Sequence, residues 1–366
     1  MRQWEYGSNS ILSAASSTRK YFGLDSGYPS SPVIDRWLAE HSFRCVIVLL
    51  VDAMGVSILK DHFRETDFLR SHMVHQLDTV FPTATTAATT ALRTGRAPGE
   101  TGWVGWTQYF READDQIIPF LSAGMYSGKK YEPHFAEHML ETEFTVDEMN
   151  RRGIRAECVW PAWGEVNPCQ DFAAVLKKTA ELAGEKDVRY IYSYWDRLDS
   201  LMHIHGTKAA VVHEELLSVN ALCEAFAKEL PGDAGVIILA DHGQVDCLPV
   251  RLYEDQELMD CLNRYPSLEP RVCAFSVKPE RAEEFESMFQ ERYGSEFVLI
   301  PSHRIAEAGW FGPVNPEKLR PEFVEDYLCY SIGKQRIACN EKQAKTIGDH
   351  GSILEEERKI PLILYP

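Results

Sequence analysis

Three apolar runs of β-branched and aromatic residues constrain the fold of this chain more than any other feature. They are CVIVLLV at 45–51, VRYIYSYW at 188–195 and GVIILA at 235–240. Runs without alternation of polar and apolar residues are typical of strands buried on both faces. Amphipathic helical patterns lie between them, notably at 171–183 and 209–229. This alternation predicts an α/β fold, a doubly wound, mostly parallel sheet covered by helices.

The pattern changes after the third run, and the change predicts a second, smaller unit. Residues 245–339 combine short strand-like runs with helical patterns, which indicates a small α+β cap insertion. The core is then expected at 44–244 and 340–366. Residues 1–43 hold a helical pattern and a Pro/Ser-rich turn, and we expect them to form an N-terminal extension packed on the core.

Composition narrows the partners and the location. The 366 residues carry a formal net charge of −17, which disfavours binding to a nucleic-acid polymer but allows a small phosphate substrate whose charge metal ions neutralise. No apolar run is long enough for a membrane span, and the N-terminus lacks the pattern of a secretory signal. Nine cysteines without CxxC spacing favour reduced, buried thiols. We therefore expect a cytoplasmic protein without membrane contact, whose oligomeric state the sequence does not define.

Candidate polar residues directly follow the first and the third buried runs. Asp52 closes CVIVLLVD, and Asp241 with His242 follows the third run in LADHG. In open α/β sheets, ligands bind beyond the carboxyl ends of the strands, so these side chains are candidates for a site. The simpler alternatives are a helix N-cap for Asp52 and an ordinary turn for the Asp241 pair.

The stretch FPTATTAATTALRTG joins a predicted strand to a predicted helix. Its first helical turn holds Thr83, Thr85 and Thr86. A hydroxyl there faces free backbone N–H groups and the positive end of the helix dipole, which suits a phosphoryl oxygen and a nucleophilic threonine. The alternative is that Thr83 or Thr85 only caps the helix while Thr89 and Thr90 pack in its interior.

Two further segments carry candidate metal ligands. Asp199 and His203 lie four residues apart after the second run, a spacing that brings both to one side of a helix, with His205 as a competing ligand. His350 lies in a glycine-flanked loop before the last apolar run. Its neighbour Asp349 is either a supporting partner or a surface charge.

Together these residues describe a binuclear metal site, in which two sets of three oxygen and nitrogen ligands surround one hydroxyl. The seven are Asp52, Thr85, Asp199, His203, Asp241, His242 and His350.

The same motifs identify a family. Over residues 44–366 the chain resembles the alkaline phosphatase superfamily, and within it is most similar to the type I phosphodiesterase/nucleotide pyrophosphatase branch. The resemblance is carried, in the family's order, by LLVDAMG, FPTATTAATTALRTG, DSLMHIHG, ADHG and DHGSILEEERKIPLIL.

The resemblance implies a hydrolase of phosphodiester or nucleotide pyrophosphate bonds that uses two divalent ions. Zinc is the expected metal for both ions, and manganese is the alternative. It assigns one zinc to Asp52, Asp241 and His242, bridged to the nucleophile Thr85, and the other to Asp199, His203 and His350. Thr85 would attack phosphorus in line to give a phosphothreonine that water then hydrolyses.

One departure from the family bears on the substrate. The branch typically has Phe-Pro-Asn after the nucleophile, whereas this chain has Thr86, Ala87 and Ala88. Nucleotide specificity is therefore open, and we expect the backbone N–H of Thr86 and the hydroxyl of Thr89 to bind substrate instead. The aromatic stretch GETGWVGWTQYF either lines the substrate pocket or forms a hairpin in the core.

Three alternatives differ in chemistry. A phosphonoacetate hydrolase-like or phosphomonoesterase activity would use the same site, and a manganese-dependent phosphomutase relative would require further basic phosphate ligands. A non-catalytic binding protein of the same fold is disfavoured, because all seven positions carry residues able to do the chemistry.

Overall fold

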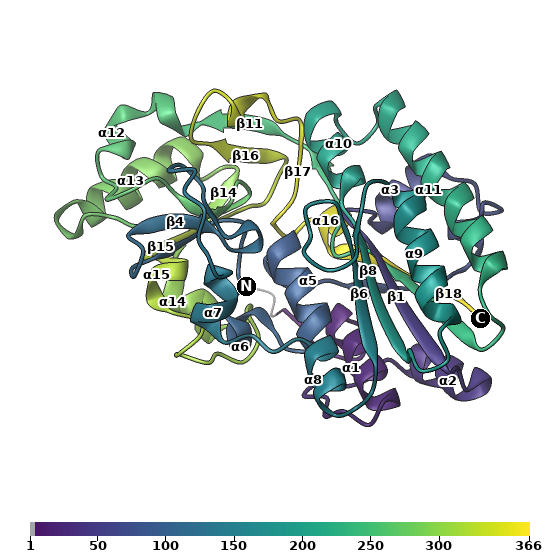
Figure 1. Cartoon of the computed structure of the whole chain (residues 1–366). Helices are drawn as coiled ribbons and strands as arrows, with labels where there is room; N and C mark the ends of the chain where they lie inside the picture. The colour runs from purple at the N-terminus through teal and green to yellow at the C-terminus, as the bar shows by residue number, and fades with distance from the viewer. Residues whose placement is uncertain (1–3) are drawn as a thin grey trace.

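The strands of the main sheet form where the sequence is continuously apolar. The computed structural model describes residues 4–366 (Figure 1). In it, β1 (Cys45–Val51), β8 (Tyr190–Trp195) and β9 (Ala234–Leu239) are buried along their whole length. β1 lies between the other two and runs parallel to both. The predicted α/β class is confirmed.

The sheet has seven strands, and the direction of its last strand determines where the site can form. Their order is β2 (Met73–Asp78), β18 (Lys359–Tyr365), β9, β1, β8, β6 (Ala156–Pro161) and β7 (Pro168–Cys169). β18 runs antiparallel to β9 and β2, while the other neighbours are parallel. The chain therefore enters β18 at the edge where β1, β2, β8 and β9 end.

Helices cover both faces of this sheet (Figure 1). On one side α9 packs on β6 and β8, and α11 packs against α9 and α10; on the other, α1 packs on α5 and α5 on α8. Their bounds are α1 (Ile11–Tyr21), α2 (Pro32–His41), α3 (Val56–His62), α4 (Phe68–Ser71), α5 (Thr85–Thr94), α8 (Thr145–Arg151), α9 (Phe172–Gly184), α10 (Arg197–His205), α11 (Ala210–Glu229) and α16 (Glu355–Arg358).

A four-stranded antiparallel sheet forms the centre of the second unit, the cap, on the other side of α5 in Figure 1. Its order is β12 (Ser267–Glu269), β13 (Val272–Phe275), β15 (Tyr327–Ser331) and β14 (Phe297–Pro301). The neighbouring helices are α12 (Gln256–Met259), α13 (Ala282–Tyr293), α14 (Ser302–Glu307) and α15 (Pro321–Val324). Two short pairs adjoin it, β10 (Val245–Asp246) with β17 (Gly348–Asp349) and β11 (Leu248–Arg251) with β16 (Gln335–Ala338).

The cap draws on a second segment of the chain, which differs from the boundary expected at 245–339. Trp103, Phe110 and Leu140 share one hydrophobic cluster with Leu268 and Phe323. The segment contains α6 (Pro98–Thr101), β3 (Gln108–Phe110), β4 (Asp115–Ile118), β5 (Ala123–Gly124) and α7 (Phe135–Leu140). Trp103 and Phe110 are buried in this cluster, whereas Phe120 of the same segment packs against Trp160 and Tyr194 beside the main sheet.

Short 3₁₀ turns complete the secondary structure: η1 (Pro119–Leu121), η2 (Leu252–Glu254), η3 (Pro279–Arg281) and η4 (Gln343–Lys345). All nine cysteines are buried, and each is a free thiol. Within residues 4–366, no helix has both the length and the apolar character that crossing a bilayer requires.

A buried ion pair joins the cap to α16, the short helix before β18. Arg271 and Glu357 have fully buried side chains, with Arg271 Nε and Nη2 lying 2.7 and 2.9 Å from the two carboxylate oxygens. Glu357 also accepts the backbone N–H groups of Ser352 and Leu354. Two elements distant in sequence are thus held by one fully hydrogen-bonded pair of charges.

Replacing Arg271 by Met should lower the free energy of unfolding by about 3–5 kcal/mol, because it leaves the Glu357 carboxylate buried without its cation. Urea unfolding followed by tryptophan fluorescence measures the change. The double variant R271M/E357Q should recover part of the loss, since it removes the unpaired charge and keeps a carbonyl acceptor for the backbone. A double variant no more stable than R271M would show that charge burial is not the cause.

Candidate active site

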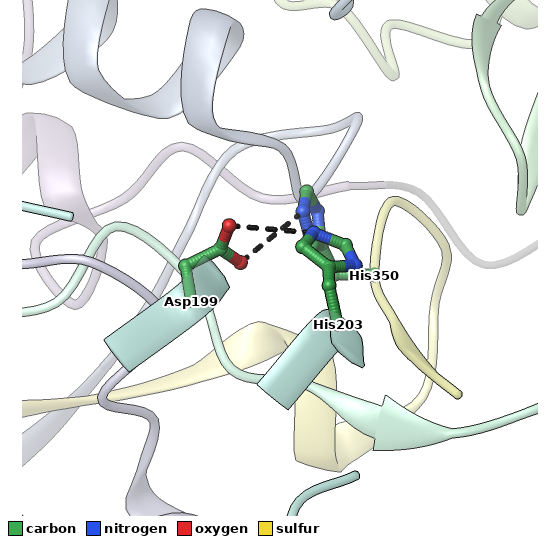
Figure 2. A group of neighbouring side chains, drawn as sticks. All are labelled: Asp199, His203 and His350. Carbon is green, nitrogen blue, oxygen red and sulfur yellow. Dashed lines mark ion pairs between the residues drawn. The ribbon is translucent and has the colours of Figure 1, made fainter. Parts of the chain in front are cut away.

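The six predicted metal ligands converge at the carboxyl edge of the sheet in two groups of three. Asp52 follows β1, and Asp241 and His242 follow β9; their ligand atoms lie within 4.8 Å of one another. The second group, drawn in Figure 2, takes Asp199 and His203 from α10 and His350 from the loop before β18, again within 4.8 Å.

Each of the three histidines is oriented by its own backbone contact. The Nδ1 atoms of His203, His242 and His350 lie 2.7, 3.0 and 3.0 Å from the carbonyl oxygens of Gly348, Gly243 and Thr83. A carbonyl can only accept, so each Nδ1 carries a proton, and in the neutral ring each Nε2 presents its lone pair. This is the tautomer and orientation of a histidine that binds a metal through Nε2.

The three aspartates each keep one oxygen without a partner. Within residues 4–366, Asp52 Oδ1, Asp199 Oδ1 and Asp241 Oδ2 are buried and accept no hydrogen bond. Asp241 Oδ1, by contrast, accepts the backbone N–H groups of Ala53 and His242 at 3.1 and 3.0 Å. Unpartnered buried carboxylate oxygens beside imidazole lone pairs are the donors that zinc prefers, so the residues present fit two such ions.

The electrostatics of the site indicate a missing positive charge. Burial, and then the neighbouring Asp241, raises the pKa of Asp52 well above its usual value, and burial raises the pKa of Asp241 to about 6. Burial also lowers the pKa of His242 and of His350 to about 4, so both rings are neutral at physiological pH. Raised carboxyl pKa values and lowered imidazole pKa values are the response of such buried groups to the lack of a neighbouring cation.

The second group is internally paired. Burial lowers the pKa of His203, but the Asp199 carboxylate outweighs it and raises that pKa to about 10. The Nε2 atom of His203 lies 3.3 Å from Asp199, and that of His350 lies 3.7 Å from it (Figure 2). Burial opposes the charged carboxylate, yet His203 lowers the pKa of Asp199 below its usual value.

Thr85 lies between the two groups at the N-terminus of α5. Its Oγ1 is 3.1 Å from His242 Nε2, and it lines the same cavity as Asp199 and His350. Ala84, before it, gives the helix no side-chain cap, and no described residue accepts the backbone N–H groups of Thr85 and Thr86. A phosphoryl oxygen could accept hydrogen bonds from these two N–H groups.

The side chains of the other predicted residues lie elsewhere. Thr89, expected to bind substrate, donates its hydroxyl to the Thr85 carbonyl at 2.7 Å and does not line the cavity. The Thr86 side chain is fully buried outside the cavity, which leaves only its backbone N–H for substrate. His205 is exposed, and Asp349 is a supporting residue that accepts from Arg336 Nε at 2.5 Å and from the His350 N–H at 2.9 Å.

Sequence reasoning missed Tyr194. Its hydroxyl donates to Asp52 Oδ2, which leaves Oδ1 as the free oxygen of that carboxylate. The ring is held by Trp160, Trp163 and Phe120, with centroids 5.3–6.0 Å away. Tyr194 lies one residue before the end of β8, so its position near the catalytic edge could be inferred from the sequence. Its contact with Asp52 could not, because that requires knowing that β8 lies beside β1.

The aromatic stretch after α5 serves both purposes that its sequence suggested. Part of it forms the β3–β4 hairpin in the cap cluster, while Trp106 and Thr107 line a cavity of about 350 Å³ beside the candidate ligands. The cap supplies the opposite wall, including Tyr126, Glu269 and Arg336.

Comparisons with known proteins agree with this geometry. A sequence model of the type I phosphodiesterase / nucleotide pyrophosphatase family matches residues 46–291. A comparison with curated protein sequences finds no match. Among solved structures, the chain is similar to murine ectonucleotide pyrophosphatase / phosphodiesterase 5 (TM-score 0.63, 17% identity, 87% of each chain covered). An inactive threonine-to-alanine variant of that murine protein in complex with AMP matches with TM-score 0.63, 16% identity and 87% of each chain.

The human ectonucleotide pyrophosphatase / phosphodiesterase 5 is similar with TM-score 0.65 and 15% identity, over 88% of this chain and 87% of that one. These structures share the fold, and the family model covers most of the catalytic edge described above, including five of the six candidate ligands. The chain therefore belongs to the type I phosphodiesterase/nucleotide pyrophosphatase family of the alkaline phosphatase superfamily and is a phosphoric ester hydrolase.

Proposed function

We propose that this enzyme hydrolyses small phosphodiester or nucleotide pyrophosphate bonds with Thr85 as nucleophile. Two divalent ions would assist the reaction, with zinc as the expected metal and manganese as the alternative. The observation that carries the proposal is the set of three unpartnered carboxylate oxygens and three histidine Nε2 atoms gathered around Thr85. Asp52, Asp241 and His242 would hold one ion, and Asp199, His203 and His350 the other.

Bound ions would lower the pKa of a coordinated hydroxyl and neutralise the charge of the phosphoryl oxygens. Thr85 Oγ1 then attacks phosphorus, the bond from phosphorus to the leaving oxygen breaks, and the phosphoryl group is carried on Thr85. Water cleaves the phosphothreonine and restores the hydroxyl. The free N–H groups of Thr85 and Thr86 are positioned to donate to a phosphoryl oxygen during both steps.

Two features of the similar structures support this proposal. The murine relative is inactive as a threonine-to-alanine variant, which is the behaviour expected of a family with a threonine nucleophile. The same variant holds AMP, a small phosphate compound. We also propose a cytoplasmic location, which nine free thiols support because such thiols are typical of a reducing compartment.

Replacing Thr85 by Ala should reduce the turnover of bis-p-nitrophenyl phosphate by about 1,000-fold or more, because the nucleophile is lost. Zinc content, measured by elemental analysis, should stay near that of the wild type. Thr89→Ala is the matched control on the same helix, and it should retain activity within about threefold because its hydroxyl contacts only the Thr85 carbonyl. A T85A variant that retains most of its activity would exclude Thr85 as nucleophile.

Replacing His350 by Ala should lower the metal content from about two ions per chain to about one, and activity should fall with it, because one of the three ligands of the second ion is removed. Elemental analysis and hydrolysis of bis-p-nitrophenyl phosphate and p-nitrophenyl phosphate on the same samples give the result. His303→Ala, at an exposed position, is the control. Wild-type protein that stays metal-free and inactive after zinc or manganese is supplied would refute the binuclear site.

Tyr194→Phe should weaken zinc binding about 10-fold, because Asp52 loses the hydroxyl that orients it. Competition with a chromogenic chelator measures the affinity. Tyr192→Phe is a closely matched control, since Tyr192 lies on the same strand and is equally buried, but its hydroxyl has no partner among the described residues. Equal affinities in the two variants would rule out a role for Tyr194 in holding Asp52.

A further inference from the structure

The cavity between the candidate ligands and the cap limits which chemical groups a substrate can have beside its phosphoryl group. This inference rests on the proposed function. The core side of the cavity holds Thr85, Asp199 and His350, and the cap side holds Trp106 and Glu269. A phosphoryl group at Thr85 therefore leaves one of its substituents facing the cap. The chemistry of that wall determines which substituents are accepted.

Glu269 places a carboxyl group on this wall without a cation. The residue is 4% exposed, and its Oε1 accepts the Trp106 backbone N–H at 2.6 Å. Among the described residues, Oε2 accepts no hydrogen bond and no lysine or arginine pairs with it. Burial raises the pKa of Glu269 well above its usual value, as expected of a carboxyl group that lacks a positive partner.

Glu269 is close to the catalytic loop. Gly351, next to His350, has φ 120°, and a Cβ atom there would lie 2.9 Å from the Glu269 Cβ. The absence of a side chain at Gly351 thus allows the loop that carries His350 to pass directly beside Glu269. A substituent that extends from the phosphoryl group toward the cap faces the wall that holds this carboxyl group.

The cavity offers little to a second phosphate. Arg336 is the one lysine or arginine that lines it, and its Nε lies 2.5 Å from Asp349 while its Nη1 donates to the Gln343 carbonyl. Its charge is therefore balanced by Asp349. A pyrophosphate would bring a further negative charge toward Glu269, which a site for that substrate would have to offset with free cations.

A positively charged substituent fits the same wall. An ammonium group donates the hydrogen bonds that Glu269 Oε2 lacks and supplies its missing charge. The aromatic rings of Trp106 and Tyr126, which line the cavity, attract cations through their faces. We propose that the substrate is a phosphodiester in which one alcohol arm carries an ammonium group bound by Glu269, rather than a pyrophosphate.

Two diesters that differ in one group test this proposal on the zinc-loaded enzyme: p-nitrophenyl 2-aminoethyl phosphate and p-nitrophenyl propyl phosphate. The wild type should show a kcat/KM at least about 10-fold higher for the aminoethyl ester, and higher for that ester than for ATP. Glu269→Gln should abolish the preference between the two esters, because it removes the charge and keeps an acceptor for the Trp106 N–H. The readout is the ratio of the two kcat/KM values within each enzyme, because a general loss of activity would lower both values and leave their ratio unchanged.

Glu341→Gln is the control, since Glu341 is an exposed carboxylate two residues from the cavity-lining Gln343 and should leave the preference intact. Zinc content and the melting temperature of E269Q establish that it is folded and loaded. Equal rates for the two esters in the wild type, a preference that survives E269Q, or a preference for ATP would each overturn the inference. Failure of the zinc-loaded wild type to hydrolyse either ester or ATP would instead refute the proposed function.

Discussion

The uncompensated negative charge at the carboxyl edge of the main sheet is the constraint on which the site depends. Asp52, Asp199 and Asp241 each bury a carboxylate oxygen that no described group satisfies. A protein does not keep such oxygens at no cost, because an unpaired charge is strongly disfavoured in a buried environment. The surrounding structure holds these oxygens in place, and a bound cation would make that arrangement favourable.

The backbone around Ala53 holds two of these aspartates in position. Ala53 takes a left-handed conformation, φ 58°, directly after Asp52, and its N–H reaches Asp241. That conformation is unfavourable for alanine by about 1 kcal/mol. Because β1 and β9 are neighbours in the sheet, the backbone turn at Ala53 links the aspartate after β1 to the aspartate after β9. The geometry of the site is thus set by the sheet more than by the loops.

Much of the site could be predicted because its residues follow buried strands. Asp52, Asp241 and His242 stand at the ends of runs that are apolar along their whole length, so their position at the edge follows from the strand pattern alone. Tyr194 and Glu269 could not be found in this way. Tyr194 reaches Asp52 only because β8 lies beside β1, and Glu269 faces the cavity only because the cap docks there. Thr89 was expected to bind substrate, but a threonine inside a helix can bond to the carbonyl four residues before it, and this one does.

The alanines that follow Thr85 and Thr86 leave the helix without side chains that could bind a substrate. Ala87 and Ala88 are buried against the core and present no group to a substrate. If Thr85 is the nucleophile, selection among substrates falls to residues of the cap wall, which come from two separate segments of the chain. The wall is also coupled to the candidate metal ligands, because Arg336 pairs with Asp349, which accepts the His350 N–H.

The position of β18 also affects how the enzyme is made. This strand is the last of the sheet in chain order, yet it lies between β2 and β9. Until it has been synthesised, β9 has an open edge with unpaired backbone groups, and β2 has no neighbour in the sheet. Such edges can pair with other chains, so the nascent protein passes through a stage in which it is prone to association. The loop that carries His350 leads through α16 into this strand, so it reaches the edge of the sheet only when the sheet closes.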